Sequence, residues 1–360
     1  MNTDRTHHSG RTEMDIHMVG VGTALPGPPV DNDTLVARFR MPSVWTQWID
    51  VFVGTDTRHF ARDLATGGVR QSLSDLCETA GRRALAGADM TGAEIDMIVL
   101  GTATPDLLMP STACLVADRL GIDGVPAYQL QSGCTGALQA LDVAALALRG
   151  GRATTALVLG ADTSAHHLDL DTDLAGAPPE VQVNAMLFGD GAGAAVLDTR
   201  PRPGAAVLRE VSCELVGAGR APGQVVPWYG PADEIPDAPP VSEDFKGVEH
   251  AALPMAESAL ASLLDGLGWK RTELDYLLPP QLSGRMTSKV VAGLDIPGAR
   301  VISRVTDIGN TANALPFFQL EQLLPLLEPG DRAVGLSVEA SKWITASYAV
   351  EAPGADWEEF

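Results

Sequence analysis

Residues 125–148, VPAYQLQSGCTGALQALDVAALAL, form the stretch that decides the fold. Its first six residues are typical of a short extended strand, and the chain then turns at QSG, 131–133. From there small and apolar residues recur with helical spacing, interrupted only by Asp142 and ended by RGG, 149–151. A helix that is apolar on nearly every face belongs in the middle of a domain. We therefore predict a buried strand–turn–helix unit around which the rest of the chain is organised.

Cys134 lies where this predicted strand becomes the predicted helix. The unpaired amides and the positive dipole end of the helix point toward its sulfur, which lowers the pKa of a thiol and favours the nucleophilic thiolate. Gly133 and Gly136 leave room for a substrate to approach the backbone. Free cysteine is also among the most buried residue types, so a small core residue is the alternative interpretation. We treat Cys134 as a candidate nucleophile.

The composition restricts the class of protein. With 360 residues, 45% of them hydrophobic, the chain can form one large domain or two fused ones. No apolar run approaches the roughly 20 residues that cross a membrane. Residues 1–15 lack the apolar core of a signal peptide, so we predict a disordered lead-in there. Acidic residues outnumber basic residues 46 to 25, which disfavours nucleic acid as a partner.

Four cysteines are present: Cys77, Cys114, Cys134 and Cys213. They form no CxxC pair and show no metal-ligand spacing with histidine. This pattern is typical of the reducing cytoplasm, and we predict a cytoplasmic protein without a metal site.

The sequence contains an internal duplication. A predicted helix at 72–90 is followed by a buried strand at 94–106, and the same order returns at 250–269 and 273–281. At nearly the same offset GCT, 133–135, faces GNT, 309–311, and the buried strand 154–162 faces 331–339. We predict an α/β fold of two βαβ-type halves, 16–200 and 201–350, each with a largely parallel sheet, and a tail at 351–360.

The duplication has a functional consequence. If the halves pack about a pseudo-twofold axis, equivalent turns converge, which brings Cys134 and Asn310 to one site. A thiolate beside an amide donor at a helix N-terminus suits acyl transfer.

Several motifs together resemble the thiolase-fold condensing enzymes, most closely the type III β-ketoacyl-acyl-carrier-protein synthases, over about residues 16–350. They are VGVGTALP (19–26), PSTACLVADRLGI (110–122), the Cys134 turn, LFGDGAGAAVL (187–197) and GNTANA (309–314). The resemblance implies a five-layered αβαβα homodimer that needs no cofactor and takes an acyl-coenzyme A or acyl-carrier thioester as substrate. It also implies that Cys134 is the acylated nucleophile and that Asn310 is the catalytic asparagine.

The chain departs from the family at the catalytic histidine. Where the family has Pro-His-Gln, this sequence has Pro279-Pro280-Gln281, and the proline at position 280 can neither donate a hydrogen bond nor move a proton. The glycine-rich loop of the family is replaced by EASKWIT, 339–345. Phe52 stands where the family has an arginine near coenzyme A. We therefore do not expect ordinary decarboxylative condensation, and four residues are candidates for a substitute base: His166, His167, His250 and Glu339.

Other candidate positions concern binding. By the same resemblance, Trp48 flanks a pantetheine tunnel or else packs in the core, and Met109 reaches across the dimer interface or else fills core space. Arg285 and Lys289 match the helix on which the family docks its carrier protein, although exposed basic residues are most often only solvated.

Two functions are consistent with these observations. The first is a divergent acyltransferase or condensing enzyme of specialised, polyketide-type metabolism, in which Cys134 passes its acyl group to a second, carrier-bound substrate; tetronate-type ring formation is one example. The alternative is a catalytically idle partner subunit or an acyl-binding protein. Cys134 and Asn310 favour the enzyme, whereas Pro280 and the altered loop favour the idle subunit. Neither function involves nucleic acid or a membrane.

Overall fold

The computed structural model describes residues 14–168, 170–171, 173–227 and 241–354. The elements of the N-terminal half are β1 (His17–Ala24), β2 (Val30–Asp31), α1 (Asn32–Arg38), α2 (Val44–Trp48), η1 (Ile49–Val53), β3 (Thr57–Arg58), α3 (Leu73–Gly87), η2 (Gly92–Glu94), β4 (Ile98–Gly101), α4 (Thr112–Leu120), β5 (Ala127–Leu130), η3 (Gly133–Thr135), α5 (Gly136–Arg149), β6 (Thr155–Asp162), η4 (Ser164–His167), α6 (Pro179–Leu187) and β7 (Gly191–Asp198). Those of the C-terminal half are β8 (Ala206–Leu215), β9 (Gln224–Val225), β10 (Ser242–Glu243), α7 (Phe245–Leu267), η5 (Arg271–Glu273), β11 (Tyr276–Leu278), α8 (Gly284–Leu294), β12 (Arg300–Val301), α9 (Val305–Ile308), η6 (Ala312–Ala314), α10 (Leu315–Leu323), η7 (Leu324–Leu326), β13 (Arg332–Glu339) and β14 (Ile344–Glu351).

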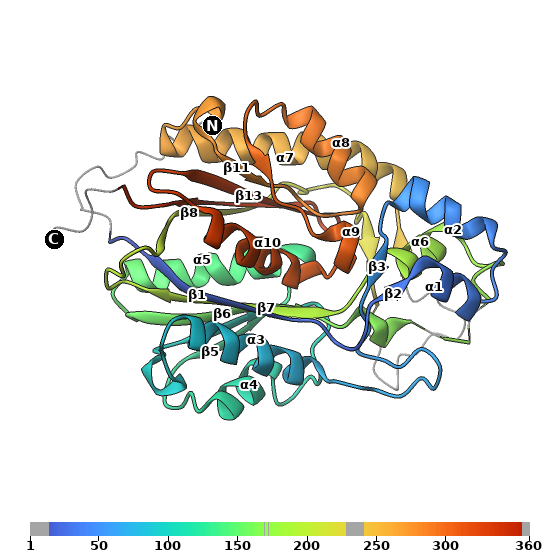
Figure 1. Ribbon diagram of the computed structural model, residues 1–360, viewed down its shortest axis with the longest axis horizontal. Helices are drawn as coiled ribbons and strands as arrows, with labels where there is room; N and C mark the ends of the chain where they lie inside the picture. Colours follow the sequence, from blue (N-terminus) through green and yellow to red (C-terminus); the bar gives the residue numbers. More distant parts are fainter. Residues whose placement is uncertain (1–13, 169, 172, 228–240, 355–360) are drawn as a thin grey trace.

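The elements are arranged in five alternating layers, as predicted (Figure 1). Helices α5 and α10 form the central layer, with strands on both sides of it and with α7 and α8 outside one strand layer and α3 and α4 outside the other. The strands of both layers belong to one ten-stranded sheet that wraps around the central helices. The two layers join where β1 pairs with β8 over only two residue pairs.

The topology of the sheet confirms the duplication. From one edge to the junction the strand order is β5-β4-β6-β7-β1, and from the other edge it is β12-β11-β13-β14-β8. Each strand of the first series has its counterpart seven strands later in the second series, in the same order. The strands that the sequence pairs, 154–162 with 331–339, are the equivalent strands β6 and β13.

The prediction of a largely parallel sheet in each half is confirmed only in part. Strands β4 and β11 pair in parallel with both neighbours, but β7 and β14 pair antiparallel with theirs. Helices cover both faces of the sheet, so β6 and β7 are buried along their whole length. Long apolar strands are typical of parallel sheets, and here the same pattern arises because antiparallel strands are covered on both faces.

The predicted core helix is confirmed. Along α5, Leu138, Leu141 and Leu148 are fully buried, and they belong to the same apolar cluster as Phe317 and Leu320 of α10. Burial of each large apolar side chain stabilises the fold by about 1.5–3 kcal/mol. The central layer thus fixes the N-terminus of α5, which carries Cys134.

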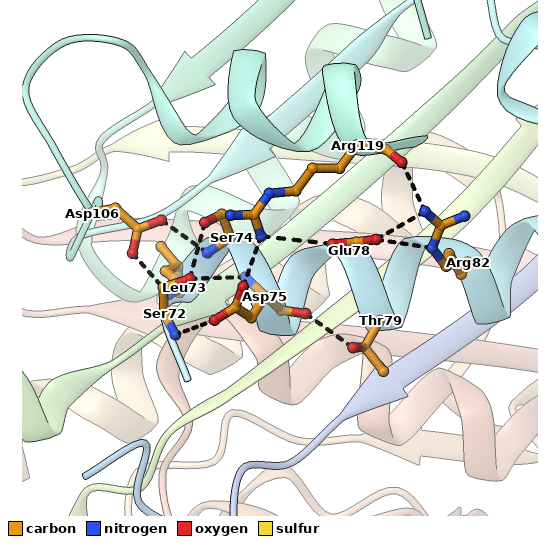
Figure 2. Close-up of polar contacts among 9 residues, drawn as sticks. All are labelled: Ser72, Leu73, Ser74, Asp75, Glu78, Thr79, Arg82, Asp106 and Arg119. Carbon is orange, nitrogen blue, oxygen red and sulfur yellow. Dashed lines mark hydrogen bonds and ion pairs between the residues drawn. The ribbon is translucent and has the colours of Figure 1, made fainter. Parts of the chain in front are cut away.

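Asp106 lies beside the N-terminus of the outer helix α3 (Figure 2). Its carboxylate accepts hydrogen bonds from the backbone N–H groups of Leu73 and Ser74 at the N-terminus of α3, both at 2.8 Å. A carboxylate in this place binds unpaired amides and the positive end of the helix dipole. Asp106 therefore fixes the loop 102–111 against α3.

A smaller apolar cluster lies at one end of the layered body, where α1, α2 and α6 gather (Figure 1). Its fully buried members include Leu35, Ile49 and Met186. Its members Phe60 and Leu174 line the same cavity as Asp162, which ends β6.

Two predicted segments lie mostly outside the described residues: the lead-in 1–15 and the tail 351–360. None of the described helices is long and apolar enough to cross a membrane.

Candidate active site

Cys134 lies in the short turn η3, directly before α5, as the sequence predicts. Its side chain lines a cavity of about 440 Å³ at the end of the sheet. Most of the cavity wall is apolar and includes Phe60, Leu168, Leu174, Val181, Phe188 and Val226. Its polar residues are Thr104, Asp162, Ser164, Asn184 and Gln224. A cavity of this size and character suits an acyl chain or a small ligand of similar polarity.

Glu339 contacts the backbone of Cys134. It ends β13, is only 2% exposed, and its Oε2 accepts a hydrogen bond from the Cys134 N–H at 2.7 Å. Gly133 makes this approach feasible: its φ is 52°, and a Cβ there would lie 1.8 Å from the same oxygen. The N–H of a nucleophile is a common donor to an acyl oxyanion, and here a carboxylate occupies it.

Asn313 joins the two halves next to Cys134. Its Oδ1 accepts the backbone N–H of Ala137 at 2.8 Å, and its Nδ2 donates to the carbonyl of Gly133 at 2.9 Å and to Asp162 at 2.7 Å. Asn313 and Asp162 are both at most 1% exposed. Because all these contacts are satisfied, Asn313 fixes the start of α5 and the turn that carries Cys134.

Asp162 and Glu339 occupy equivalent places in the two halves, at the ends of β6 and β13. Each carboxylate accepts a backbone N–H from the turn of the other half: Glu339 from Cys134 at 2.7 Å and Asp162 from Asn313 at 3.1 Å. The predicted convergence of equivalent turns is therefore present, and it places two carboxylates beside the cysteine turn.

The prediction that the helix end lowers the pKa of Cys134 is wrong. Burial raises the pKa of this thiol well above its ordinary value, and the carboxylates of Glu339, Asp162 and Glu243 raise it further. Burial also raises the pKa of Asp162, against the donors that surround its carboxylate. Desolvation and nearby negative charge both disfavour a thiolate, and together they exceed the effect of one helix terminus. The resting cysteine is a thiol.

Asn310 and Pro280 are both buried, and each has a hydrogen-bond partner in a neighbouring segment. The Asn310 side chain donates to the carbonyl of Leu282 at 3.1 Å and accepts the N–H of Ala312 at 2.9 Å. Ala312 lines the cavity, whereas Asn310 is not among its described lining residues. Pro280 is buried just after β11, and its carbonyl accepts the hydroxyl of Thr287 at 3.1 Å.

The candidate bases are placed differently from one another. His166 is exposed on η4, next to lining residues, and the side chain of His167 lies outside what the structure describes. His250 is exposed inside α7, a helix that begins at Phe245 and not at residue 250 as predicted. Of the four candidates, Glu339 is the one with a hydrogen bond to Cys134 among the described contacts.

The aromatic and apolar candidates lie near the surface. The half-buried Trp48 ring lies 4.9 Å from Trp45 and 5.6 Å from the exposed Phe52, so it packs in an aromatic group. Met109 is 86% exposed and follows two exposed leucines, so it does not fill core space in this chain.

The basic candidates on α8 have local partners. Arg285 donates to the carbonyl of Val51 at 3.1 Å, and its guanidinium lies 6.0 Å from the Phe52 ring. Lys289 forms an exposed ion pair with Glu249 at 2.9 Å. Both side chains remain at the surface, where such pairs contribute little to stability.

Two residues of the site were missed by sequence reasoning: Asp162 and Asn313. A signal for both was present, because Asp162 matches Glu339 in the duplicated strands and Asn313 lies in the GNTANA motif. No pattern within one half of the sequence predicts that Asp162 and Asn313 are hydrogen-bonded to each other.

Family models identify both halves of the chain. The model of 3-oxoacyl-[acyl-carrier-protein (ACP)] synthase III matches residues 128–213, and the model of its C-terminal part matches residues 264–346.

Known proteins match over most of the chain. The β-ketoacyl-[acyl-carrier-protein] synthase III of Neisseria meningitidis serogroup A is 32% identical over 302 residues, which are 82% of this chain and 86% of the relative. A solved structure described as "AbyA1 - tetronic acid condensing enzyme" is 52% identical, with a TM-score of 0.91 over 94% of this chain and 100% of that one. The priming β-ketosynthase of the R1128 polyketide pathway is 25% identical, with a TM-score of 0.80 over 96% and 99%. The chain belongs to the family of type III β-ketoacyl-acyl-carrier-protein synthases, the thiolase-fold condensing enzymes that transfer acyl groups.

Proposed function

We propose that this chain is a divergent condensing enzyme of specialised metabolism that carries its acyl group on Cys134. The sulfur attacks the carbonyl carbon of an acyl thioester, and the thiol of coenzyme A or of a carrier protein leaves. A second, carrier-bound substrate then attacks the Cys134 thioester and releases the cysteine thiol. The observation that carries this proposal is the place of Cys134 at the apolar cavity, with Glu339 bonded to its N–H.

Glu339 is the proposed base. The raised pKa of Cys134 means that the thiol must lose a proton as it attacks, and Pro280 cannot accept one. The Glu339 carboxylate lies at the backbone of the same cysteine. In this proposal Glu339 takes the proton of the Cys134 thiol and thereby frees the Cys134 N–H for the thioester oxygen. It then gives the proton to the sulfur of coenzyme A or of the carrier protein as that thiol leaves.

The likeness to AbyA1 supports the nature of the second substrate. That protein is described as a tetronic acid condensing enzyme, and the present chain covers its whole length at 52% identity. We propose that this chain joins an acyl thioester to a carrier-bound nucleophile. A nucleophile with an acidic proton of its own tolerates a site in which the family histidine is Pro280.

We also propose an oligomeric state, a docking surface for the carrier protein and a cellular location. We propose a cytoplasmic homodimer in which the exposed segment Leu107, Leu108 and Met109 meets the second subunit. A carrier protein would dock near Arg285 and Lys289, which offer positive charge on a chain with a net charge of −21.

A two-step transfer experiment tests the function. The protein is first incubated with an acyl thioester, freed of excess donor, and then given a carrier protein loaded with a nucleophilic acyl group. We expect the acyl group to move from the protein to the carrier, and Cys134→Ala to abolish this transfer. Equal product from the Cys134→Ala variant would contradict the covalent route.

A further inference from the structure

We propose that Glu339 makes the Cys134 cavity selective by charge, so that it admits neutral thioesters and rejects those with a carboxylate on the reacting carbon. This selectivity rests on the proposed function, because it concerns the second substrate of that same site. It assigns Glu339 a role in specificity in addition to proton transfer.

Three carboxylates lie at or next to the cavity. Glu339 is bonded to the Cys134 N–H, and Asp162 lines the same cavity. Glu243 accepts a hydrogen bond at 3.0 Å from Asn184, another lining residue. The described lining residues include no lysine, arginine or histidine to offset these carboxylates.

The Glu339 side chain is shielded from solvent. It is 2% exposed, and its two oxygens accept the backbone N–H groups of Cys134 and Ser341. Both contacts are donors, which suits an ionised carboxylate. Water that would screen this charge is largely excluded, so the field of Glu339 acts strongly within the cavity.

A condensation brings the attacking carbon of the second substrate up to the acyl group on Cys134. In a malonyl thioester, the carbon that attacks the Cys134-bound acyl group itself carries the carboxylate. When that carbon bonds to the acyl carbon, the carboxylate is two bonds away from the carbonyl carbon of the Cys134 thioester. It is then within a few ångströms of the Cys134 turn, beside which the Glu339 carboxylate lies. Two like charges so close in a dry site repel each other strongly, whereas a neutral substrate of the same shape is unaffected.

The consequence for the reaction concerns how the nucleophile forms. A substrate without that carboxylate cannot become a nucleophile by losing CO₂, so it must lose a proton instead. The proton passes to Glu339, the carbanion or alkoxide attacks the acyl carbon, and the proton then goes to the sulfur of Cys134 as the C–S bond breaks. No oxidant, reductant or further reactant is needed.

A matched pair of ligands tests this selectivity. Malonyl-pantetheine and malonamyl-pantetheine have nearly the same shape, but the second carries an amide in place of the carboxylate. Binding is measured by calorimetry on the Cys134→Ala protein, in which no acylation interferes. We expect malonamyl-pantetheine to bind at least about tenfold more tightly than malonyl-pantetheine.

Two further variants, made in the same Cys134→Ala protein, identify the charge that is responsible. Glu339→Gln removes the proposed charge, and we expect the ratio of the two affinities to fall to within about threefold of one. Glu249→Gln is the control: this glutamate is exposed and ion-paired with Lys289 on the outer helices, and the ratio should stay unchanged. If Glu339→Gln fails to fold, a third ligand replaces that variant: β-alanyl-pantetheine, which carries an ammonium group in place of the carboxylate, should bind the Cys134→Ala protein at least as tightly as malonamyl-pantetheine.

The outcomes are distinct. Equal affinity for the two thioesters while Glu339 is present would overturn the proposed selectivity but leave acyl transfer through Cys134 intact. An undiminished ratio in Glu339→Gln would overturn the assignment to this residue. Binding of neither thioester would contradict the proposed function itself, and the selectivity with it.

Discussion

The carboxylate of Glu339 accepts the backbone N–H of Cys134 at 2.7 Å, across 205 positions of sequence. This contact joins the last residue of β13, in the C-terminal half, to the turn that carries Cys134 in the N-terminal half. It occupies the donor that an acyl oxygen needs, and it brings a buried negative charge to the cysteine. The resting site is therefore closed to the thioester oxygen until Glu339 releases this amide.

The pH dependence of the alkylation rate of Cys134 should reveal the negative charge of Glu339. We expect the rate of alkylation of Cys134 to keep rising with pH beyond the range of a free thiol, because burial and Glu339 raise its pKa. Glu339→Gln removes one negative charge, so the pKa of the thiol should fall and the rate profile should move to lower pH. Peptide mass mapping separates Cys134 from the exposed Cys114. A profile centred near pH 7, or one unmoved by Glu339→Gln, would contradict this description.

The stability of the protein should depend on pH through Asp190. Burial raises the pKa of this carboxyl from 3.8 to about 7 in the folded state. The folded state thus keeps a proton that the unfolded state loses, and the free energy of unfolding decreases as pH rises from about 4 to about 7. The slope reaches at most about 1.4 kcal/mol per pH unit for this group.

Urea unfolding between these pH values measures the effect. Asp190→Asn should lower stability at all pH values, because the carboxylate accepts the N–H groups of Ala61 and Ala165. It should also flatten the pH dependence. Stability that rises with pH over this window in the unsubstituted protein, or a slope that Asp190→Asn leaves unchanged, would be incompatible with the raised pKa.

Restoring the family histidine should not by itself restore the family reaction. In Pro280→His we expect acylation of Cys134 to continue, because Pro280 is not among the described residues that line the cavity. Decarboxylation of a malonyl thioester should stay near background while Glu339 remains, and should rise in the double variant with Glu339→Gln. Release of CO₂ is the measurement. Efficient decarboxylation by Pro280→His alone would show that charge does not limit this reaction.

The residue patterns were sufficient to predict an α/β fold and the duplication, and the resemblance to the family implied the five layers. The buried strands at 154–162 and 331–339 and the apolar helix after Cys134 carry strong local patterns, and the structure contains all three. Strand direction was not predictable in the same way, because β7 is as apolar as a parallel strand although it pairs antiparallel.

The chemistry of the site was less predictable, because its contacts join distant segments. The sign of the pKa shift of Cys134 depends on Glu339, Asp162 and Glu243, which reach the cysteine only after folding. The residues next to Cys134 in the sequence indicate the helix terminus but not the carboxylates. Asn313 was missed for the same reason, since its partners at 133, 137 and 162 belong to the other half.

Acylation of Cys134 is the central claim, and intact-protein mass spectrometry tests it most directly. The protein and its Cys134→Ala variant are incubated with a panel of acyl-coenzyme A and acyl-carrier thioesters. We predict a mass gain of one acyl group from at least one donor, absent in the variant. No adduct from any donor, on folded protein whose thiol still reacts with an alkylating agent, would contradict the account and indicate an idle partner subunit or an acyl-binding protein.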